Sequence, residues 1–473
     1  MRNILLSCFL CFPLALFGDN QTSTVSPVLP PTDLPFTISI EKSKLQLPNG
    51  WHSGAVGIHK DKCLLIAGRT NGLHGFSNNP NVNNFPPYTQ NNTVYVIDFE
   101  SGKIWSRTLQ DSSAGLTDVV IDTLTVTSPE SYQKGHTLYM VGGYGIDSST
   151  NQMTTKSTLT AIDVPGLIHW VINPGKKRIA SQYIRQTSDP LLQVTGGYMN
   201  QLGPEYPTLL IFGQNFTGLY NGNSNGIYTE QVRTFHIFDD GNRLSVVPTA
   251  TQPAQNPVYR RRDLNVVPVW LAGKYTPYPA YMALSGVFTE SGGIWTVPVK
   301  ILPDGNSFMR DPQDPAAFKQ AMNNYDSATI GLFSGQTQDM YVIVLGGMTY
   351  GFFQNGVFQT DAHIPFTNEV TTIKIDKDHN FTQYIMANQY PTIPAQFSHP
   401  GNPLLFGSDA AFVLKRDLPL YVNDVIALDQ LKHKSHVLGY IIGGIESTSA
   451  NTLTPAESAA SPYIFKVKLD RVE

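Results

Sequence analysis

Short apolar runs that end in a small residue and glycine recur along this chain. Each run predicts a buried strand followed by a tight turn, because glycine adopts backbone conformations that other residues avoid. The six runs lie at residues 65–68, 140–143, 211–213, 283–286, 344–347 and 441–444. Their last glycines are 75, 70, 73, 61 and 97 residues apart, which predicts six structural repeats.

A second strand follows most of these runs after a polar loop. The apolar segments that predict it lie at residues 94–98, 159–163, 232–237 and 370–376. Triplets rich in Asp, Pro and Gly, which favour hairpin turns, lie at residues 100–102, 164–166, 239–241 and 303–305. In the first two repeats a tryptophan, Trp105 or Trp170, lies seven residues after Asp98 or Asp163.

This order of glycine pair, strand, turn and tryptophan resembles the kelch β-propeller family. The resemblance covers residues 36–473 and is clearest in the first two repeats, whereas repeats three and four lack the full glycine pair. It implies an all-β fold, a single six-bladed β-propeller. Kelch repeats are about 50 residues long, so the longer repeats of this chain imply inserted loops.

The two ends of the chain suggest how such a ring closes. The last repeat supplies only three strands, at residues 411–414, 440–442 and 463–467. Residues 36–40 form an alternating strand that has no partner of its own. We therefore expect this N-terminal strand to complete the last blade, which removes an exposed sheet edge.

The first 18 residues are typical of a secretory signal, with a basic residue before an apolar run too short to span a membrane. We expect export to the periplasm, the cell surface or the medium. Residues 19–35 contain four prolines and predict a flexible lead-in. Because Cys8 and Cys11 lie in the signal, the mature chain keeps only Cys63, which we expect to be buried and unpaired.

Composition narrows the classes of partner. Only 14% of the residues are charged and the net charge is −4, which argues against a nucleic-acid-binding protein. No stretch after the signal approaches the length of a membrane span. We expect a monomer whose partner is a glycan or a protein.

Long loops are expected on one face of the ring. In a four-stranded blade, loops between strands two and three share a face with the connections between blades. These loops, at residues 69–92, 214–230 and 348–368, are rich in Asn, Tyr and Gly. Such residues make adaptable contacts, and long loops on a rigid scaffold commonly bind ligands. The alternative is a solvated rim of self-bonded Asn turns.

Acidic residues recur where the innermost strands are expected to begin. They are Asp122, Asp189, Asp263, Asp326 and Asp409, with His52 at this position in the first blade. We expect a ring of these side chains near the channel mouth. They either cap backbone N–H groups between blades or bind a polyhydroxylated ligand or a cation such as Ca²⁺. Ca²⁺ is the one cofactor that the sequence leaves open.

A basic cluster, residues 259–263 (YRRRD), stands out on this charge-poor chain. In an extended strand Arg260 and Arg262 point one way, and Arg261 and Asp263 the other. The arginines either neutralise the acidic ring or bind a carboxylate through two hydrogen bonds. The predicted ligand-binding residues, expected to border one concave mouth, are His52, Arg69, His74, Tyr259, Arg260, Arg262, Asp263, Asp326 and Asp409.

Known chemistries of the kelch ring guide the functional hypothesis. Galactose-oxidase-like enzymes use copper with a tyrosine–cysteine crosslink and paired histidines, but no Tyr-His pair occurs here and Cys63 lies in a predicted strand. Sialic-acid mutarotases share the ring, which is an analogy of fold only. We predict an exported propeller that binds a glycan or protein. The alternative is a carbohydrate-active enzyme (a sugar-acid epimerase, mutarotase or lyase) using the Arg/Asp mouth.

Overall fold

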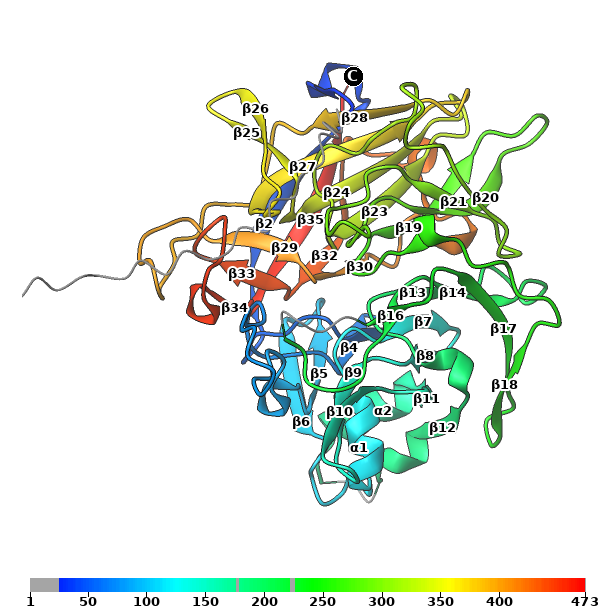
Figure 1. Cartoon of the computed structure of the whole chain (residues 1–473), viewed down its shortest axis with the longest axis vertical. Helices are drawn as coiled ribbons and strands as arrows, with labels where there is room; N and C mark the ends of the chain where they lie inside the picture. Colours follow the sequence, from blue (N-terminus) through cyan, green and yellow to red (C-terminus); the bar gives the residue numbers. More distant parts are fainter. Residues whose placement is uncertain (1–24, 176–177, 222–225, 473) are drawn as a thin grey trace, which may run out of the picture.

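The computed structural model describes residues 25–175, 178–221 and 226–472. Within these residues the chain is mostly β-strand, arranged in small antiparallel sheets (Figure 1). The prediction of an all-β fold of this kind is confirmed. The expected signal at residues 1–18, with Cys8 and Cys11, lies outside the described residues.

Six sheets contain four strands or more and follow one another along the chain. Sheet one contains β3 (Ala55–His59), β4 (Lys62–Ile66), β5 (Thr93–Asp98) and β6 (Lys103–Thr108). Sheet two contains β7 (Glu130–Lys134), β8 (Thr137–Val141), β11 (Thr158–Asp163) and β12 (Ile184–Ser188). Sheet three contains β13 (Tyr198–Asn200), β14 (Thr208–Ile211), β17 (Val232–Asp239) and β18 (Leu244–Pro248).

The second half of the chain repeats this order. Sheet four contains β19 (Val266–Leu271), β20 (Tyr278–Ala283), β21 (Val299–Ile301) and β22 (Ser307–Met309). The main strands of sheet five are β23 (Ala328–Phe333), β24 (Met340–Met348), β27 (Phe366–Ile375) and β28 (Phe381–Ile385). Sheet six contains β30 (Ala411–Leu414), β32 (Ser435–Ile442), β35 (Tyr463–Arg471) and β2 (Phe36–Gln46). In Figure 1 the first three sheets lie in the lower half and the last three in the upper half.

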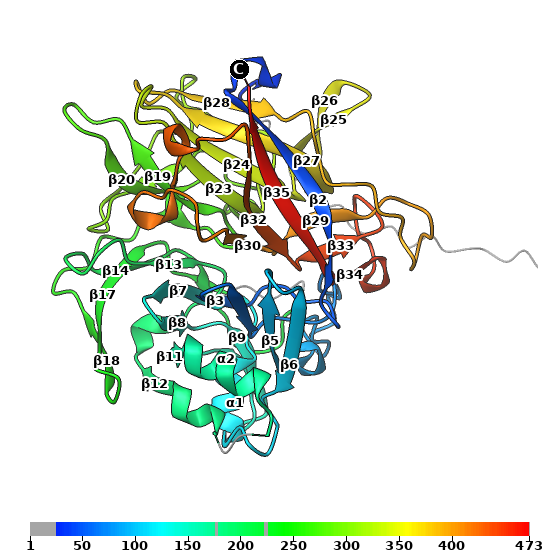
Figure 2. The same ribbon diagram turned by 180° about the vertical axis from the view of Figure 1, so that it is seen from behind.

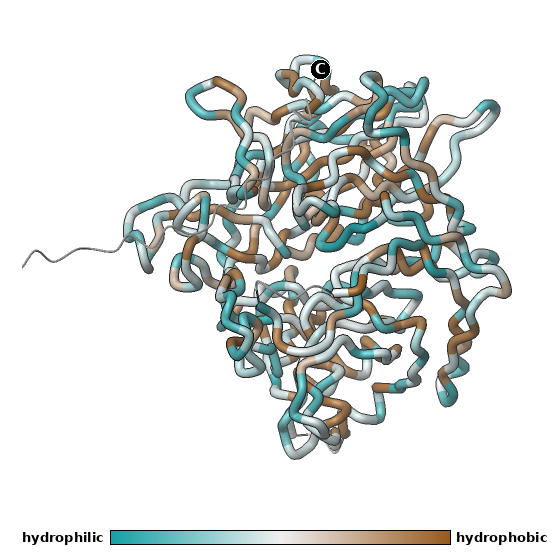
Figure 3. The backbone as a smooth tube through the Cα atoms, viewed as in Figure 1, coloured by the Kyte–Doolittle hydropathy of each residue, from teal (hydrophilic) through white to brown (hydrophobic). Residues whose placement is uncertain are grey.

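Each sheet packs on the next through an apolar cluster of its own. Leu64 and Leu138 belong to the cluster between sheets one and two, and corresponding clusters follow between the later sheets. A further cluster packs Leu65 of sheet one against Val413 and Ile464 of sheet six. Apolar stretches of the tube in Figure 3 follow these strands. The packing therefore returns from the last sheet to the first, which is the arrangement of a β-propeller.

The glycine pairs of the sequence lie where neighbouring sheets come closest. A Cβ atom added at Gly142 would lie 2.1 Å from the carbonyl oxygen of Val194, which precedes sheet three. At Gly443 it would lie 2.0 Å from the carbonyl oxygen of Trp51, which precedes sheet one. Both glycines have φ of +64°. The recurrent glycine is therefore required by contact between sheets as well as by the turn.

A belt of backbone hydrogen bonds joins the residues that precede the innermost strands. The central belt consists of Ser53, Ser128, Gly196, Asp263, Asp326 and Asp409. Each bond runs from the backbone N–H of one residue to the carbonyl oxygen of another. The donor–acceptor pairs are Ser53–Asp409 (3.3 Å), Ser128–Ser53 (2.9 Å), Gly196–Ser128 (3.2 Å), Asp263–Gly196 (2.8 Å) and Asp409–Asp326 (2.8 Å). Each of these five bonds crosses from one sheet to the next, so the belt follows the axis across every junction between sheets except that between Asp263 and Asp326.

Strand β2 joins the N-terminal region to the last sheet. It pairs antiparallel with β35, with Phe36 opposite Arg471 and Ile40 opposite Val467. Figure 2 shows the two strands side by side. Phe36 and Ile38 are 1% exposed and pack into the cluster shared with sheet five. The strand is thus paired on one edge and buried on one face.

Part of the segment predicted as a flexible lead-in is built into sheet five. Strand β1 (Val28–Leu29) pairs in parallel with β28, and the N–H of Ser26 donates to the carbonyl oxygen of Lys319 at 2.9 Å. The prediction of flexibility is therefore wrong for these residues. The outer edge of β28 offers unpaired backbone groups, and the lead-in satisfies them.

The predicted hairpin turn at residues 164–166 is instead the start of a helix. Helix α2 (Val164–Ile172) begins where Asp163 accepts a hydrogen bond from the N–H of Gly166 at 2.7 Å. Trp170 therefore lies in a helix, whereas Trp105, at the same spacing from its Asp, lies on β6. Five buried apolar side chains of α2 hold it against sheet one, and the outer strand of sheet two begins only at Ile184.

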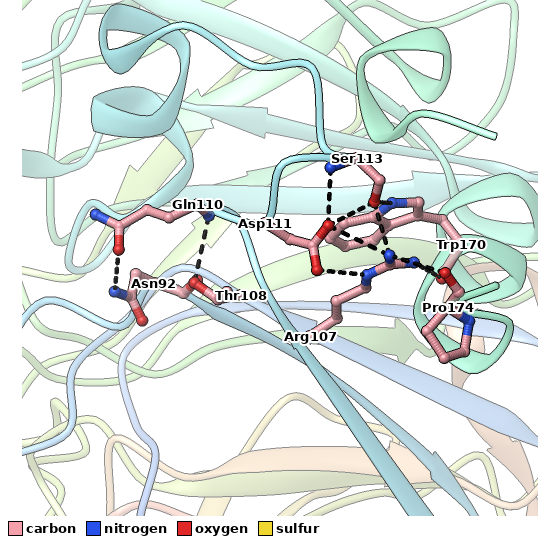
Figure 4. A network of polar contacts seen from close by, with 8 residues as sticks. All are labelled: Asn92, Arg107, Thr108, Gln110, Asp111, Ser113, Trp170 and Pro174. Carbon is pink, nitrogen blue, oxygen red and sulfur yellow. Dashed lines mark hydrogen bonds and ion pairs between the residues drawn. The ribbon is translucent and has the colours of Figure 1, made fainter. Parts of the chain in front are cut away.

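Polar contacts anchor α2 to the outer strand of sheet one (Figure 4). The Arg107 guanidinium lies 4.5 Å from the Trp170 ring centre and donates to the Trp170 carbonyl oxygen at 2.8 Å. It also donates to Ser113 at 2.7 Å and pairs with Asp111 at 3.3 Å. The Trp170 indole donates to Ser113 Oγ at 3.1 Å. One buried arginine thus connects a strand, a loop and the helix.

Other local predictions agree with the structure. Gly102, Gly241 and Gly305 have φ of +68°, +88° and +92° in turns that join adjacent strands, as expected for hairpins. Cys63 is buried and unpaired, and burial raises the pKa of its thiol. Among the described helices, none combines the length and the apolar character needed to cross a membrane.

Candidate functional site

The loops of sheets one, three and four enclose a cavity of about 620 Å³, called here the mouth cavity. Its aromatic lining consists of Phe76, Phe216, Tyr220, Tyr228, Phe288 and Tyr325, and its charged lining includes Arg260, Arg262 and Glu290. The loop of sheet one contacts the loop of sheet three, because the N–H of Asn84 donates to the Tyr220 carbonyl oxygen at 2.9 Å. A cavity of this size is typical of small-molecule sites.

Arg262 organises the wall of the mouth cavity. Its Nε donates to the Tyr228 hydroxyl at 3.1 Å and its Nη2 to the Tyr220 hydroxyl at 3.0 Å. Its Nη1 pairs with Asp263 Oδ2 at 3.3 Å. Although burial opposes its charge, Tyr220 and Asp263 hold the pKa of Arg262 above its usual value. Because both tyrosine oxygens accept from a cation, each keeps its own O–H to donate to a ligand.

Arg260 lies beside Arg262 with part of its guanidinium free. The group lies 4.0 Å from the Tyr228 ring centre, and its Nη1 donates to the carbonyl oxygens of Phe288 and Thr289. Its other nitrogens make no hydrogen bond to described residues. Arg260 therefore has donors for an acceptor group in the mouth cavity.

A narrower cavity of about 60 Å³, the throat, continues from the mouth cavity towards the axis. Six residues line both cavities: His74, Gln214, Phe216, Tyr220, Arg262 and Tyr325. The Tyr325 hydroxyl donates to Asp263 Oδ2 at 3.1 Å. Burial raises the pKa of the Asp263 carboxyl, which Arg262 opposes. The throat therefore places a carboxyl and a phenol next to each other below the mouth.

The histidines of the site are neutral near pH 7. His74 lies between aromatic rings, 4.8 Å from Phe85 and 5.1 Å from Tyr220, and burial lowers its pKa to about 4. Burial, with the charge of Arg69, lowers the pKa of His52 to about 3. His52 Nδ1 lies 2.7 Å from Ser53 Oγ. Both rings are therefore packing and hydrogen-bonding groups in this pH range.

Asp326 and Asp409 form a carboxyl pair at the axis. Their carboxyl groups are close enough to act on each other's protonation, which favours a proton held between them. Asp409 also accepts from Ser53 Oγ at 2.7 Å and from Ser408 Oγ at 2.9 Å. Burial, and then the charge of Asp409, raises the pKa of Asp326 well above its usual range. The pair therefore favours holding a proton more strongly than two separate carboxyl groups would.

The structure brings together most of the predicted site residues. His52, His74, Arg260, Arg262, Asp263 and Asp409 line the mouth cavity or the throat, and Asp326 adjoins Asp409. Two predicted residues lie elsewhere. Arg69 is 1% exposed behind the throat, with Nε donating to Asn71 Oδ1 at 2.9 Å. Tyr259 stacks on Phe212 in the core between sheets three and four.

The expected ring of carboxylates is wrong in sheets two and three. Asp122 lies in helix α1 (Asp118–Leu124) and accepts from the N–H and Oγ of Ser148 at 2.7 Å. Asp189 caps a short 3₁₀ helix by accepting from the N–H of Leu191. The belt positions of these sheets are Ser128 and Gly196. Short helical segments before the innermost strands shift the alignment, so only three belt residues are acidic.

The expected side-chain directions in the basic cluster hold for the three arginines but are wrong for Asp263. Arg261 is fully buried, with Nη2 donating to the Val297 carbonyl oxygen at 2.9 Å. Asp263 points to the side of Arg262, with which it pairs. Residues 257–259 form a 3₁₀ turn and Asp263 has φ of +47°. The alternation of an extended strand therefore does not extend to Asp263.

Sequence reasoning missed Ser53, Phe288 and Tyr325. Ser53 and Tyr325 each adjoin a predicted residue, His52 or Asp326, and this proximity was the available signal. In contrast, the long loop of sheet five does not line the mouth cavity. Its hairpin of β25 (Gly351–Gln354) and β26 (Val357–Thr360) projects from the body in Figure 1, and Asp361 accepts from Asn451 at 2.9 Å.

The carboxylates do not form a metal centre of recognisable geometry. Within the described ranges, no group of three or more His, Cys, Asp or Glu side chains is arranged to hold a metal ion. The geometry therefore lends no support to the Ca²⁺ site that the sequence left open.

Comparison with known proteins adds a similarity of backbone fold. No protein-family model matches the chain, and no curated protein matches it. The solved structure of YjhT aligns with 91% of this chain and 100% of its own, at 10% identity and a TM-score of 0.45. The likeness is loose. The propeller assignment therefore rests on the sheet order, the clusters between sheets and the central belt.

Proposed function

We propose that this protein is an exported, monomeric, six-bladed kelch-type propeller that binds a glycan in the mouth cavity. The observation that carries the proposal is the Arg262 network, which presents the Tyr220 and Tyr228 hydroxyls to an aromatic-lined cavity of about 620 Å³. A sugar has apolar C–H faces and a rim of hydroxyl groups. Aromatic walls with a few fixed polar groups match both features.

The ring-closing role of the N-terminal strand belongs to the same proposal. It is supported by the pairing of β2 with β35 and by the burial of Phe36 and Ile38 in the cluster shared with sheet five. A closed ring keeps the three loops that form the mouth at fixed distances. This rigidity favours binding by reducing the entropy lost on association.

The concave shape favours a glycan over a protein partner. The mouth cavity is a concave site of about 620 Å³ lined by three loops, whereas protein interfaces bury much larger and flatter areas. A glycan chain can enter through one end of the cavity and leave the rest of the loop face exposed.

A carbohydrate-active enzyme is the second candidate, and the Asp263–Tyr325 contact favours it. A carboxyl group with a raised pKa beside a phenol is suited to proton transfer. In this alternative Arg260 holds the carboxylate of a sugar acid, and Asp263 moves a proton on the bound ring. The reaction is then an epimerisation, mutarotation or elimination.

A glycan array followed by calorimetric titration tests the binding proposal. Tyr220→Phe and Tyr228→Phe are each expected to weaken binding of a glycan hit by about three- to tenfold, the loss of one hydrogen bond. Tyr88→Phe is the matched control, since Tyr88 is 87% exposed and outside the cavity. Absence of any glycan hit, or equal affinity in all three variants, refutes the proposal.

The enzymatic candidate has its own readout. Sugar acids incubated with the protein are followed by NMR for a change at a ring carbon. Asp263→Asn is expected to abolish turnover while binding persists. Binding without any chemical change in the wild type rejects the enzyme and leaves the glycan-binding proposal standing.

A further inference from the structure

A third cavity, of about 200 Å³, continues from the throat along the axis of the ring. We call it the axial chamber. Ser53, Ser128, Asp263 and Asp409 line both the throat and the chamber, so the two cavities adjoin. None of the aromatic residues of the mouth cavity lines the chamber. It is therefore a compartment with its own chemistry.

The lining of the axial chamber is acidic and partly aromatic. Four acidic residues line it, Glu130, Asp263, Asp326 and Asp409, together with the aromatic residues Trp51 and Tyr198. No Lys, Arg or His side chain is among the described residues that line it. The apolar part of the wall consists of Pro129, Met199, Leu264, Ala410 and Ala411. This combination disfavours anions and favours a cation that carries some apolar surface.

Glu130 provides a second, independent sign of a ligand. Its side chain is 2% exposed, and its Oε1 accepts from the N–H of Gly197 at 2.7 Å. Its Oε2 is buried and accepts no hydrogen bond from the described residues. Burial raises the pKa of Glu130 to about 8. Above this pKa the buried carboxylate oxygen has no donor, so a donor placed in the chamber is stabilising.

Neither Arg233 nor Arg262 donates a hydrogen bond to Glu130 Oε2. Arg233 lies near enough to act on Glu130 through its charge, yet no ion pair joins them. Arg262 directs its charge to Asp263 and to the tyrosines of the mouth. Glu130 Oε2 in the chamber wall thus has no hydrogen-bond donor among the described residues.

We propose that the axial chamber binds a small organic ammonium ion, a primary or methylated amine. Its N–H or polarised N–CH₃ groups face the carboxyl oxygens, and its alkyl part lies against Trp51, Tyr198 and the apolar wall. The volume is smaller than that of a drug-sized site, which restricts the ligand to a few heavy atoms. The carboxyls lack the arrangement of a metal centre, as described above. This site does not depend on the glycan proposal.

Thermal shift and calorimetric titration with methylammonium chloride, choline chloride and tetramethylammonium chloride test the inference. Sodium chloride at equal ionic strength is the reference. At least one ammonium salt is expected to raise the melting temperature of the wild-type protein above the sodium chloride reference. Equal melting temperatures in all four salts overturn the proposal.

Two variants locate the binding site. Glu130→Gln and Asp326→Asn are each expected to weaken ammonium binding by about tenfold, the loss of one charge-assisted contact. Asp122→Asn, which alters a carboxylate outside the chamber, is expected to bind as the wild type does. Full affinity in both chamber variants overturns the proposal. If neither variant folds, saturation-transfer NMR on the wild type decides, because a chamber site requires contacts from the amine methyl protons to aromatic protons of Trp51 or Tyr198.

Affinity is expected to rise between pH 6 and pH 9. Glu130, whose pKa burial raises to about 8, loses its proton over this range, and burial also raises the pKa values of Asp263, Asp326 and Asp409. Arg233 and Arg262 stay charged, and Tyr198, with its pKa raised to about 12, stays neutral. An affinity that falls over this range contradicts the proposal. Glycan titrations of the same variants separate this site from the mouth, since Glu130 does not line the mouth cavity.

Discussion

Ser53 Oγ donates a 2.7 Å hydrogen bond to Oδ1 of Asp409, a residue 356 positions later in the chain. The backbone N–H of Ser53 donates to the carbonyl oxygen of the same residue. The two residues precede the innermost strands of sheets one and six. This double contact joins the first sheet to the last at the axis, beside the throat. Stability of the ring and geometry of the candidate site therefore depend on the same residues.

The N-terminal strand is expected to contribute substantially to stability. Phe36→Ala removes a side chain that is 1% exposed and packs edge-on against Tyr341 at 5.3 Å. We expect a loss of about 3–5 kcal/mol in the free energy of unfolding, measured by urea denaturation. Ser39→Ala, on the other face of the strand, is the control with little change. Equal stability of both variants contradicts the closing role of the strand.

The buried arginine of Figure 4 is expected to stabilise the contact between α2 and sheet one. Arg107→Ala leaves the Trp170 carbonyl oxygen without its donor and uncovers the indole ring. We expect a loss on the order of 3 kcal/mol, measured by thermal and urea denaturation. Arg310→Ala is the control, because Arg310 forms an exposed pair with Asp314 and should change stability by less than about 1 kcal/mol. A smaller effect at Arg107 than at Arg310 counts against this role.

Stability is expected to fall as the pH rises from about 4.5 to 8. Burial raises the pKa of Glu130 from 4.5 to about 8, so the folded protein holds a proton that the unfolded chain releases. The stabilisation is complete below the unfolded pKa and is lost as the pH passes the folded pKa. Glu130→Gln removes the titrating carboxyl group and with it this pH-dependent stabilisation. Urea denaturation from pH 5 to pH 8 should therefore show a flatter profile in the variant, and parallel profiles would argue against this titration.

Export predicts a processed N-terminus. The apolar run at residues 1–18 has the length and flanks of a signal peptide. Intact-mass measurement of protein from its native host is expected to show the loss of about 18 residues. A full-length chain in the cytosol would refute export, and it would leave the proposals for the mouth cavity and the axial chamber unaffected.

Local sequence patterns determined most strands and their turns, although the turn expected at residues 164–166 is the start of a helix. The glycine-terminated runs ending at Gly143 and Gly347 are buried strands, and the turn glycines Gly102 and Gly241 have positive φ. These features depend on residues close together in the chain. The positions of Arg260 and Arg262 beside one concave cavity also agreed with the prediction, because the YRRRD segment (residues 259–263) leads directly into an innermost strand.

Tertiary structure alone decided which residues surround the axis. The belt position is set by hydrogen bonds between sheets, and Ser128, Gly196 and Asp409 occupy it equally well because the bonds use backbone groups. Residue type therefore misled the alignment towards Asp122 and Asp189. In the same way an extended strand directs Asp263 away from Arg262, yet the two side chains pair with each other. The positive φ of Asp263 causes this difference, and no side-chain pattern records it.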